Sequence, residues 1–359
     1  MKKLLMLGLI FLLGLTEIPA CTTFCISHNQ NIFFGRNFDF DIGNGFLAVN
    51  PRGLSKTAYL PETETPAEWV SEYGSITFNQ IGVDFPMGGM NEKGLVVAQM
   101  YLREAGYPKA DDRPAVGELQ WIQYQMDNSA TVGDVLSSLN KIRISNTSMA
   151  PLHYLICDSK GQSATVEFLD GETVVHTGNK LEQQVLGNIP YPSRTKLITN
   201  QQPFGGKKPV PAKSEGVIDN IAIANARVKS YRGEKKPVDY SFDILKAIES
   251  PGRTQWSTVF DVSAREIHFK TLNNNKIRTV KMNAFAYDCH DKWQFVYLEK
   301  SNPNEEFVSQ LQEYTLKWHK AHVKDILHQY NQNLKGFPAF NEEIIRSQGL
   351  YPQNVRCKH

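Results

Sequence analysis

Residues 21–40 read CTTFCISHNQNIFFGRNFDF, and this stretch predicts a β-hairpin that starts directly behind a cysteine. The residues after the cysteine favour strands, His28–Gln30 is polar enough to form a turn, and apolar residues then resume a second strand. Folding the hairpin back brings the GRNFD segment, at the far end of the second strand, close to the start of the first. We therefore expect Arg36 and Asp39 to approach Cys21.

The residues that precede Cys21 have the parts of an export signal. Two lysines give a basic start, Leu4–Leu15 is apolar apart from two glycines, and Thr16–Ala20 is a short polar exit that ends in a small residue. The apolar run is too short to cross a bilayer comfortably. We expect residues 1–20 to be a signal peptide of an exported protein. The periplasm is the first choice of location, and a secreted or lipid-anchored protein is the alternative.

Cleavage behind the signal would make Cys21 the first residue of the mature chain. A cysteine in that position carries a thiol and a free α-amine on one carbon, which is a nucleophile with its own base. Two other interpretations stay open. The IPAC sequence is also an imperfect lipoprotein signal, in which the cysteine is lipid-modified, and Cys21 could form a structural disulfide with Cys25.

The composition excludes several function classes. The chain is 41% apolar and 21% charged, and its formal charge of +2 includes two lysines and Glu17 of the signal. A nearly neutral chain argues against nucleic acid or an anionic membrane surface as the main partner. The histidines do not cluster at metal-ligand spacing, and neither HExxH nor CxxC occurs. We therefore expect no metal and no cofactor.

The five cysteines are an odd number for an exported protein. If Cys21 stays free as a nucleophile, the remaining Cys25, Cys157, Cys289 and Cys357 can form up to two disulfides. The sequence leaves their pairing open.

The order of predicted elements indicates an α+β protein with antiparallel sheets. Strands connect through hairpins rather than through single crossovers, and helical segments fall between the groups of strands. The segments behind this prediction are two helices within Val116–Leu139, hairpin-linked strands within 151–178, helices within 217–250, a hairpin within 254–272 and a helix over Glu305–Asn333.

Four segments in this order resemble one family. CTTF at the processed N-terminus, GRNFDF, GMNEKGL at 89–95 and TQWSTVFD at 254–261 are similar to the choloylglycine hydrolase group of N-terminal-nucleophile hydrolases. That group includes bile-salt hydrolases, penicillin V acylases and related linear-amide hydrolases. The resemblance implies a four-layer αββα sandwich, two antiparallel sheets between helical layers, over residues 21–300. Residues 301–359 remain as a C-terminal helical extension of unknown role.

The resemblance also implies roles for the residues around Cys21. Cys21 would be the nucleophile, Asp39 would hold its α-amine, and Arg36 would supply positive charge that keeps the thiol ionisable. Without the cysteine, Arg36 and Asp39 would read as a surface ion pair at the end of a strand.

Three further residues match the family less closely. Asn188 in VLGNIP would donate its side-chain amide to the oxyanion, although a turn asparagine explains the same pattern. Tyr101 in AQMYL falls at the second oxyanion position, where the backbone N–H donates, and it could equally be a core tyrosine. Arg227 in IANARVKSY would be the second active-site arginine, with an exposed helical arginine as the alternative.

The expected function is hydrolysis of a small-molecule N-acyl amide through a thioester on Cys21. A penicillin V acylase-like preference for a hydrophobic or aryl acyl group is the first choice, because tyrosine stands at position 101. Conjugated bile salts, N-acyl lactones and N-acyl amino acids are the alternatives within the class. A non-catalytic envelope lipoprotein is the alternative of another class. The extension could mediate assembly into a homo-oligomer.

Overall fold

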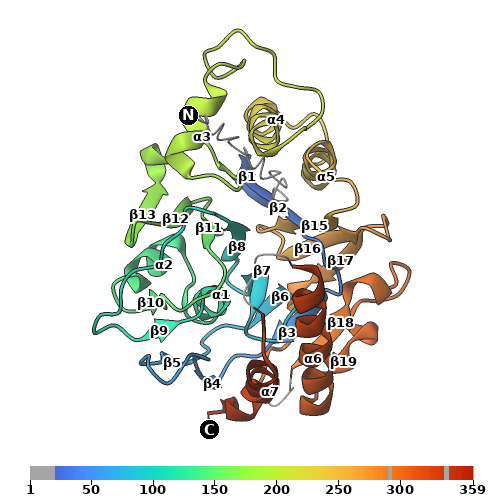
Figure 1. Cartoon of the computed structure of the whole chain (residues 1–359). Coiled ribbons are helices and arrows are strands. Elements are labelled where there is room, and N and C mark those ends of the chain that lie inside the picture. The colour runs from blue at the N-terminus through green and yellow to red at the C-terminus, as the bar shows by residue number, and fades with distance from the viewer. Residues whose placement is uncertain (1–20, 290–292, 335–338, 359) are drawn as a thin grey trace, which may run out of the picture.

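The computed structural model describes residues 21–289, 293–334 and 339–358 (Figure 1). The signal peptide expected at residues 1–20 lies outside this part of the chain. Two large sheets form the centre of the molecule, and every strand pair within them is antiparallel.

The first sheet has six strands and contains the N-terminal hairpin. Its order is β14 (Val185–Leu186), β1 (Thr22–His28), β2 (Asn31–Asp39), β15 (Thr254–Asp261), β16 (Glu266–Thr271) and β17 (Arg278–Lys281).

The second sheet has nine strands. Its order is β13 (Glu172–Thr177), β12 (Ser163–Leu169), β11 (Leu152–Cys157), β8 (Val96–Tyr101), β7 (Pro86–Asn91), β6 (Ser75–Asn79), β3 (Phe46–Asn50), β18 (Gln294–Tyr297) and β19 (Gln312–Glu313). Two smaller sheets lie outside these. One has three strands in the order β20 (Arg356–Cys357), β4 (Leu54–Thr57) and β5 (Glu68–Val70), and the other pairs β9 (Ala115–Val116) with β10 (Arg143–Ile144).

Helices cover the outer faces of both large sheets, so the four-layer arrangement and the α+β class are confirmed (Figure 1). The helices are α1 (Glu118–Asn128), α2 (Val132–Ser138), α3 (Tyr191–Ile198), α4 (Val217–Ser230), α5 (Pro237–Ala247), α6 (Leu316–Asn333) and α7 (Glu342–Leu350). Helices α4 and α5 pack on the six-stranded sheet, and α1 packs on β7 and β8 of the nine-stranded sheet. No helix in the described ranges is long and apolar enough to span a membrane.

The predicted N-terminal hairpin forms as expected. Asn29 and Gln30 both have positive φ, at 49° and 66°, which is the geometry of a two-residue turn between twisted strands. The turn fixes the register, so that Thr22 pairs with Asn37 and Thr23 pairs with Arg36. The end of β2 therefore lies beside the start of β1.

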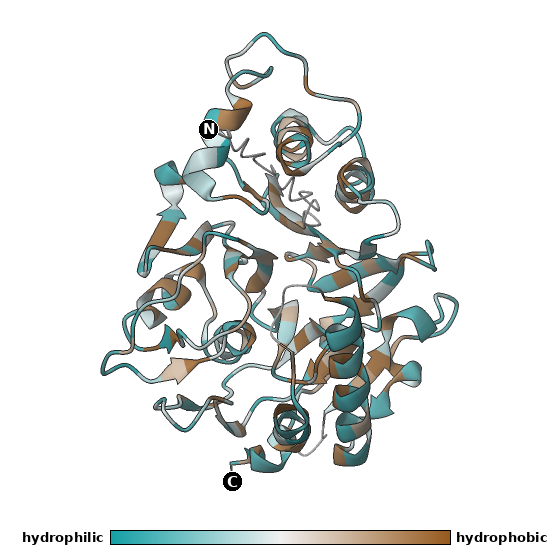
Figure 2. Cartoon of the chain, viewed as in Figure 1, coloured by the Kyte–Doolittle hydropathy of each residue, from teal (hydrophilic) through white to brown (hydrophobic). Residues whose placement is uncertain are grey.

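Side chains of the hairpin alternate between two cores. Phe24 and Ile26 point outward to α4 and α5, whereas Cys25 and Phe34 point toward the nine-stranded sheet. Phe78 of β6 meets the six-stranded sheet in edge-to-face contacts with rings of β15 and β16, at centroid distances of 6.1 and 5.7 Å. Figure 2 shows apolar residues recurring along the strands and mixed faces on the helices.

The C-terminal region differs from the prediction in two respects. The helix expected over Glu305–Asn333 begins only at Leu316, where the Thr315 side chain accepts a hydrogen bond from the backbone N–H of Trp318 and caps the helix. The residues before it form a short 3₁₀ turn and β19. The nine-stranded sheet therefore continues past residue 300, because β19 pairs with β18 at its edge.

Candidate active site

The hairpin brings Cys21, Arg36 and Asp39 together, as the sequence predicts. Cys21 directly precedes β1, and the residue is 6% exposed. The backbone N–H of Asp39 donates to Cys21 Sγ at 3.4 Å, and the backbone carbonyl of Asp39 lies 3.5 Å from the same sulfur. The start of β1 and the end of β2 thus form one corner of the site.

The thiol of Cys21 is strongly held in its neutral form in the intact chain. Burial and, to a lesser degree, the nearby Asp39 carboxylate raise its pKa to about 11, although the Arg36 guanidinium counteracts both effects. A thiol with such a pKa is protonated at neutral pH. It therefore needs a neighbouring base before it can attack a carbonyl carbon.

Arg36 lies between the two sheets. Its Nη2 donates to the carbonyl of Gln99 at 2.9 Å, and its Nη1 donates to the carbonyl of Met87. These bonds hold the charge beside the Cys21 sulfur, although burial lowers the pKa of the guanidinium. The close approach requires glycine at position 88, because a Cβ there would lie 2.8 Å from Arg36 Nη1. Arg36 and Asp39 are each 2% exposed, so they are not the surface ion pair that the sequence offered as an alternative.

Asp39 is a buried carboxylate with two hydroxyl donors. Thr254 Oγ1 donates to Asp39 Oδ1 at 2.5 Å, and Ser250 Oγ donates to Asp39 Oδ2 at 3.2 Å. Burial raises the pKa of Asp39 to about 7, while the two hydroxyls and the charge of Arg36 counteract this effect. The carboxyl group therefore titrates near neutral pH, in the range where a catalytic site works.

Arg253 is a site residue that the sequence analysis missed. Its guanidinium forms an ion pair with Asp41 at 2.6 Å, and its charge lowers the pKa of Asp39. The sequence contains a pattern that could have identified it, because Arg253 directly precedes the TQWSTVFD segment on which the family resemblance rests.

Arg227, which the resemblance implied as the second active-site arginine, lies elsewhere. It is on α4, in the helical layer outside the six-stranded sheet, and its Nη1 donates to the carbonyl of Asp243 in α5 at 3.1 Å. The α4 helix packs its buried face against Phe24, whose side chain points away from Cys25 and the inner core. The structure therefore does not bring Arg227 to Cys21, and it places Arg253 there instead.

The two expected oxyanion donors come from different sheets. Tyr101 ends β8 of the nine-stranded sheet and lines the same cavity as Cys21. Asn188 follows β14, which pairs with β1 through Thr23 and Leu186. Continuing this antiparallel register by two residues places Asn188 level with Cys21. Asn188 is not among the described residues that line the cavity.

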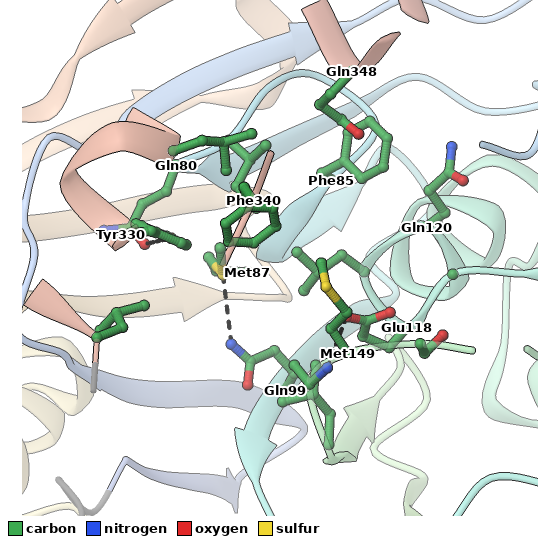
Figure 3. Close-up of a pocket in the computed structure, with 18 of the residues that line it drawn as sticks. Gln80, Phe85, Met87, Gln99, Glu118, Gln120, Met149, Tyr330, Phe340 and Gln348 are labelled. Atoms are coloured by element: carbon green, nitrogen blue, oxygen red, sulfur yellow. Dashed lines mark hydrogen bonds between the residues drawn. The ribbon is translucent and has the colours of Figure 1, made fainter. Parts of the chain in front are cut away.

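The corner formed by Cys21 and Asp39 opens into a cavity of about 1290 Å³. Its lining comes from both sheets, from the start of α1 and from α6 and α7 of the C-terminal region. Figure 3 shows Met87 and Gln99 facing each other, with Gln99 Nε2 donating to Met87 Sδ at 3.5 Å, and Tyr330 and Phe340 on one side of them. A cavity of this size holds a small organic molecule.

The other cysteines leave Cys21 without a disulfide. Cys289 and Cys357 are joined by one disulfide, whereas Cys25 and Cys157 are free thiols whose sulfurs lie 2.9 Å apart between the sheets. The Cys21–Cys25 disulfide considered from sequence therefore does not form. Among the described residues, no group of three or more His, Cys, Asp or Glu side chains has the arrangement of a metal site.

Comparisons with known proteins agree with this geometry. The family model described as linear amide C–N hydrolases, choloylglycine hydrolase family, matches residues 21–216. A penicillin V acylase of Pectobacterium atrosepticum is 30% identical over 325 residues, which cover 77% of this chain and 84% of that protein. A bile salt hydrolase/transferase of Lactiplantibacillus plantarum is 24% identical over 299 residues, which cover 71% of this chain and 90% of that protein.

Solved structures show the same fold. Penicillin V acylase from Agrobacterium tumefaciens has a TM-score of 0.69 at 24% identity, covering 82% of this chain and 98% of its own. A variant of conjugated bile acid hydrolase from Clostridium perfringens has a TM-score of 0.65 at 19% identity, covering 80% of this chain and 98% of its own. The expected N-terminal-nucleophile hydrolase sandwich is thereby confirmed as the fold.

Proposed function

The chain belongs to the choloylglycine hydrolase family of linear amide C–N hydrolases, and we propose that it is an exported hydrolase whose nucleophile is the N-terminal Cys21. The observation that carries this proposal is the position of the Cys21 thiol, which lines the large cavity between the Arg36 guanidinium and the Asp39 backbone. The substrate is a small N-acyl amide with an apolar or aryl acyl group. The 30% identity to a penicillin V acylase supports this choice.

Cleavage behind residue 20 supplies the base that the thiol needs. A free α-amine has a pKa of about 8, so part of it is unprotonated near neutral pH and can accept the thiol proton during the attack. As the sulfur attacks the amide carbonyl carbon, the α-amine takes the thiol proton and the carbonyl oxygen becomes an oxyanion. Collapse of this intermediate breaks the C–N bond, and the leaving amine takes the proton from the α-ammonium.

Hydrolysis of the thioester repeats the same proton transfers with water. Water attacks the thioester carbon while the α-amine of Cys21 takes its proton, and the thiolate leaves and is reprotonated. The products are the free acid and the starting enzyme. All groups in this cycle belong to the protein or to water, so the cycle needs no cofactor.

The other residues act on charge and position. Arg36 places a buried positive charge beside the sulfur, which stabilises the thiolate as it forms. Asp39 holds the α-amine toward the thiol when its carboxylate is ionised. The side-chain amide of Asn188 and the backbone N–H of Tyr101 donate to the oxyanion from the two sheets.

The test of this proposal is replacement of the nucleophile in the exported, processed enzyme. Cys21→Ser is expected to lose nearly all amide hydrolysis while its circular dichroism and melting temperature stay close to those of the wild type. Cys157→Ala is the matched control, since Cys157 is also a buried free thiol but does not line the cavity. Full activity in Cys21→Ser would refute the proposal.

The alternative of another class, a non-catalytic lipoprotein, predicts a different N-terminus. A lipid-modified Cys21 would carry diacylglyceryl and N-acyl groups, and N-acylation would remove the base of the proposed cycle. The mass of the N-terminal peptide of the exported protein distinguishes the two. Within the amidase class, a conjugated bile salt is the second substrate to assay, because a bile salt hydrolase/transferase is among the relatives.

A further inference from the structure

We propose that the C-terminal helices α6 and α7 form one wall of the acyl pocket and select substrates with a large apolar acyl group. This inference rests on the proposed function, because it assigns a role in that reaction to the extension whose role the sequence left open. The family model ends at residue 216, well before these helices begin at Leu316.

The apolar side chains of the extension line the catalytic cavity. Leu327 and Tyr330 of α6 are almost fully buried, at 1% and 7% exposure. Leu334, Phe340 and Ile344 line the same cavity but are only partly buried. Apolar surface that is still exposed to water inside a cavity contributes most to binding free energy when an apolar ligand covers it.

The hydrolase core adds further apolar side chains to this wall. Phe40 follows β2 directly, and its ring lies 5.7 Å from the ring of Tyr330. Phe85 and Met87 line the cavity from the nine-stranded sheet and its preceding loop. In Figure 3, Met87, Tyr330 and Phe340 lie together on one side of the cavity.

Polar side chains of α1 lie on the other side of the cavity, next to Met149. Glu118 and Gln120, at the start of α1, lie on that side in Figure 3, away from Tyr330 and Phe340. An amide bound at Cys21 has an acyl part and an amine part, and the two parts leave the carbonyl in different directions. The apolar side suits the acyl part, and the polar side suits the amine part.

Hydrogen bonds fix α6 on the loop that follows the catalytic strand β2. The Tyr330 hydroxyl donates to Gln80 Oε1 at 2.6 Å, and His322 Nε2 donates to the Gln80 carbonyl at 2.6 Å. Gln80 Nε2 in turn donates to the carbonyls of Ile42 and Gly43 at 2.6 and 2.7 Å. Ile42 and Gly43 follow Asp39 by only a few residues, and Asp39 contacts Cys21. These hydrogen bonds therefore fix the position of α6 relative to the nucleophile.

The C-terminal end of the extension is attached independently. His319 Nε2 of α6 donates to the carbonyl of Gln348 in α7 at 3.0 Å, which joins the two helices. The Tyr351 ring packs edge-on against Phe85 at 5.2 Å, and its hydroxyl donates to buried Asp84 at 3.3 Å. The disulfide to Cys357 and the pairing of β20 with β4 then hold the chain end on the core.

The size of the cavity indicates a large acyl group. Its volume of about 1290 Å³ exceeds the range of about 300–1,000 Å³ that is usual for small-molecule pockets. A phenylacetyl-sized group would leave much of the wall of Leu334, Phe340 and Ile344 uncovered. Each further buried methylene strengthens binding about fourfold, so extending the acyl chain along this wall favours the longer substrate.

The experiment compares the p-nitroanilides of butanoic and dodecanoic acid as substrates of the processed enzyme. We expect the wild type to have the higher kcat/KM for the dodecanoyl substrate, and Phe340→Ala to reduce the ratio of the two kcat/KM values about tenfold. Val308→Ala is the matched control, because Val308 is an exposed apolar residue of the extension that does not line the cavity. A ratio unchanged by Phe340→Ala would overturn the inference.

A second measurement does not depend on catalysis. Isothermal titration of dodecanoate into Cys21→Ser is expected to show binding that the added Phe340→Ala change weakens about tenfold. Equal affinities of the two proteins would overturn the wall assignment even if amide hydrolysis is established. Weakened binding in an enzyme that hydrolyses no amide would instead support the apolar wall and refute the proposed function.

Discussion

Replacing Thr254 by valine is expected to shift the pH dependence of the enzyme without changing its fold. The Thr254 hydroxyl donates to Asp39 Oδ1 at 2.5 Å, and the residue is 7% exposed. Valine keeps the shape of threonine but cannot donate. The change therefore removes a stabilising contact from the ionised form of Asp39 and raises the pKa of that carboxyl above its value of about 7.

The size of the shift follows from the strength of the bond. A hydrogen bond to a charged group contributes about 1.5–3 kcal/mol, and about 1.36 kcal/mol corresponds to one pKa unit. The acidic limb of kcat/KM should move upward by about one to two pH units. At pH 6 the variant should then be about 10- to 100-fold slower than the wild type, and at pH 9 the two should agree within about twofold.

The assay is a pH profile of kcat/KM with a chromogenic amide. Ser250→Ala removes the longer bond to Asp39, at 3.2 Å, and should give a smaller shift in the same direction. Thr279→Val is the matched control, because its hydroxyl bonds to His268 on the outer strands of the same sheet. An acidic limb that does not move in Thr254→Val would refute the requirement for ionised Asp39.

Three further predictions follow from the site. Asn188→Ala should lower kcat about 100- to 1,000-fold if its amide donates to the oxyanion, and an unchanged kcat in steady-state assays would remove it from the site. Burial raises the pKa of Asp39 to about 7 in the folded protein, whereas the carboxyl of the unfolded chain releases its proton above about pH 4. The free energy of unfolding should therefore fall as the pH rises from about 4 to about 7. Urea unfolding should show this loss in the wild type and not in Asp39→Asn, and equal slopes in both would contradict it. Arg253→Ala should raise the pKa of Asp39 further and lower kcat/KM at pH 6 by a smaller factor than Thr254→Val does, whereas Arg227→Ala should leave it unchanged; the reverse order would restore Arg227 to the site.

The sequence predicted those parts of the fold that local interactions decide. The hairpin could be predicted because a polar two-residue turn and its flanking strands are adjacent in the chain, and its register then places Arg36 and Asp39 beside Cys21. The second of the two helices predicted within Val116–Leu139 forms at Val132–Ser138, where the Thr131 side chain forms a capping box with Asp134.

Features that depend on distant segments were not predicted. Arg227 follows apolar, helix-forming sequence and Arg253 follows the Ser250–Gly252 turn, and only the packing of α4 outside the six-stranded sheet decides which arginine lies at the site. The bonds of Arg36 to Met87 and Gln99 join two sheets, so no local pattern reveals them. The start of α6 was placed too early because pairing of β19 with β18 competes with helix formation before Thr315.

The pairing of cysteines is another such feature. The sequence allowed several combinations, and Cys289 and Cys357 lie 68 residues apart in the chain. Their disulfide forms because β20 returns to the edge of β4, which brings the chain end back to the core. The same return of the chain positions α6 and α7 over the cavity, a contact that the apolar periodicity of the helices alone does not specify.

In the proposed function, processing creates the catalyst by exposing the amine of Cys21. The most direct test is the intact mass of the exported enzyme, measured before and after acid quenching during turnover of a slowly hydrolysed amide. We expect a chain that starts at Cys21 with an unmodified amine, and a transient mass increase equal to the acyl group, located on the N-terminal peptide and removed by hydroxylamine. A chain that starts elsewhere, an amine blocked by a lipid, or turnover with the acyl group on another residue would contradict it.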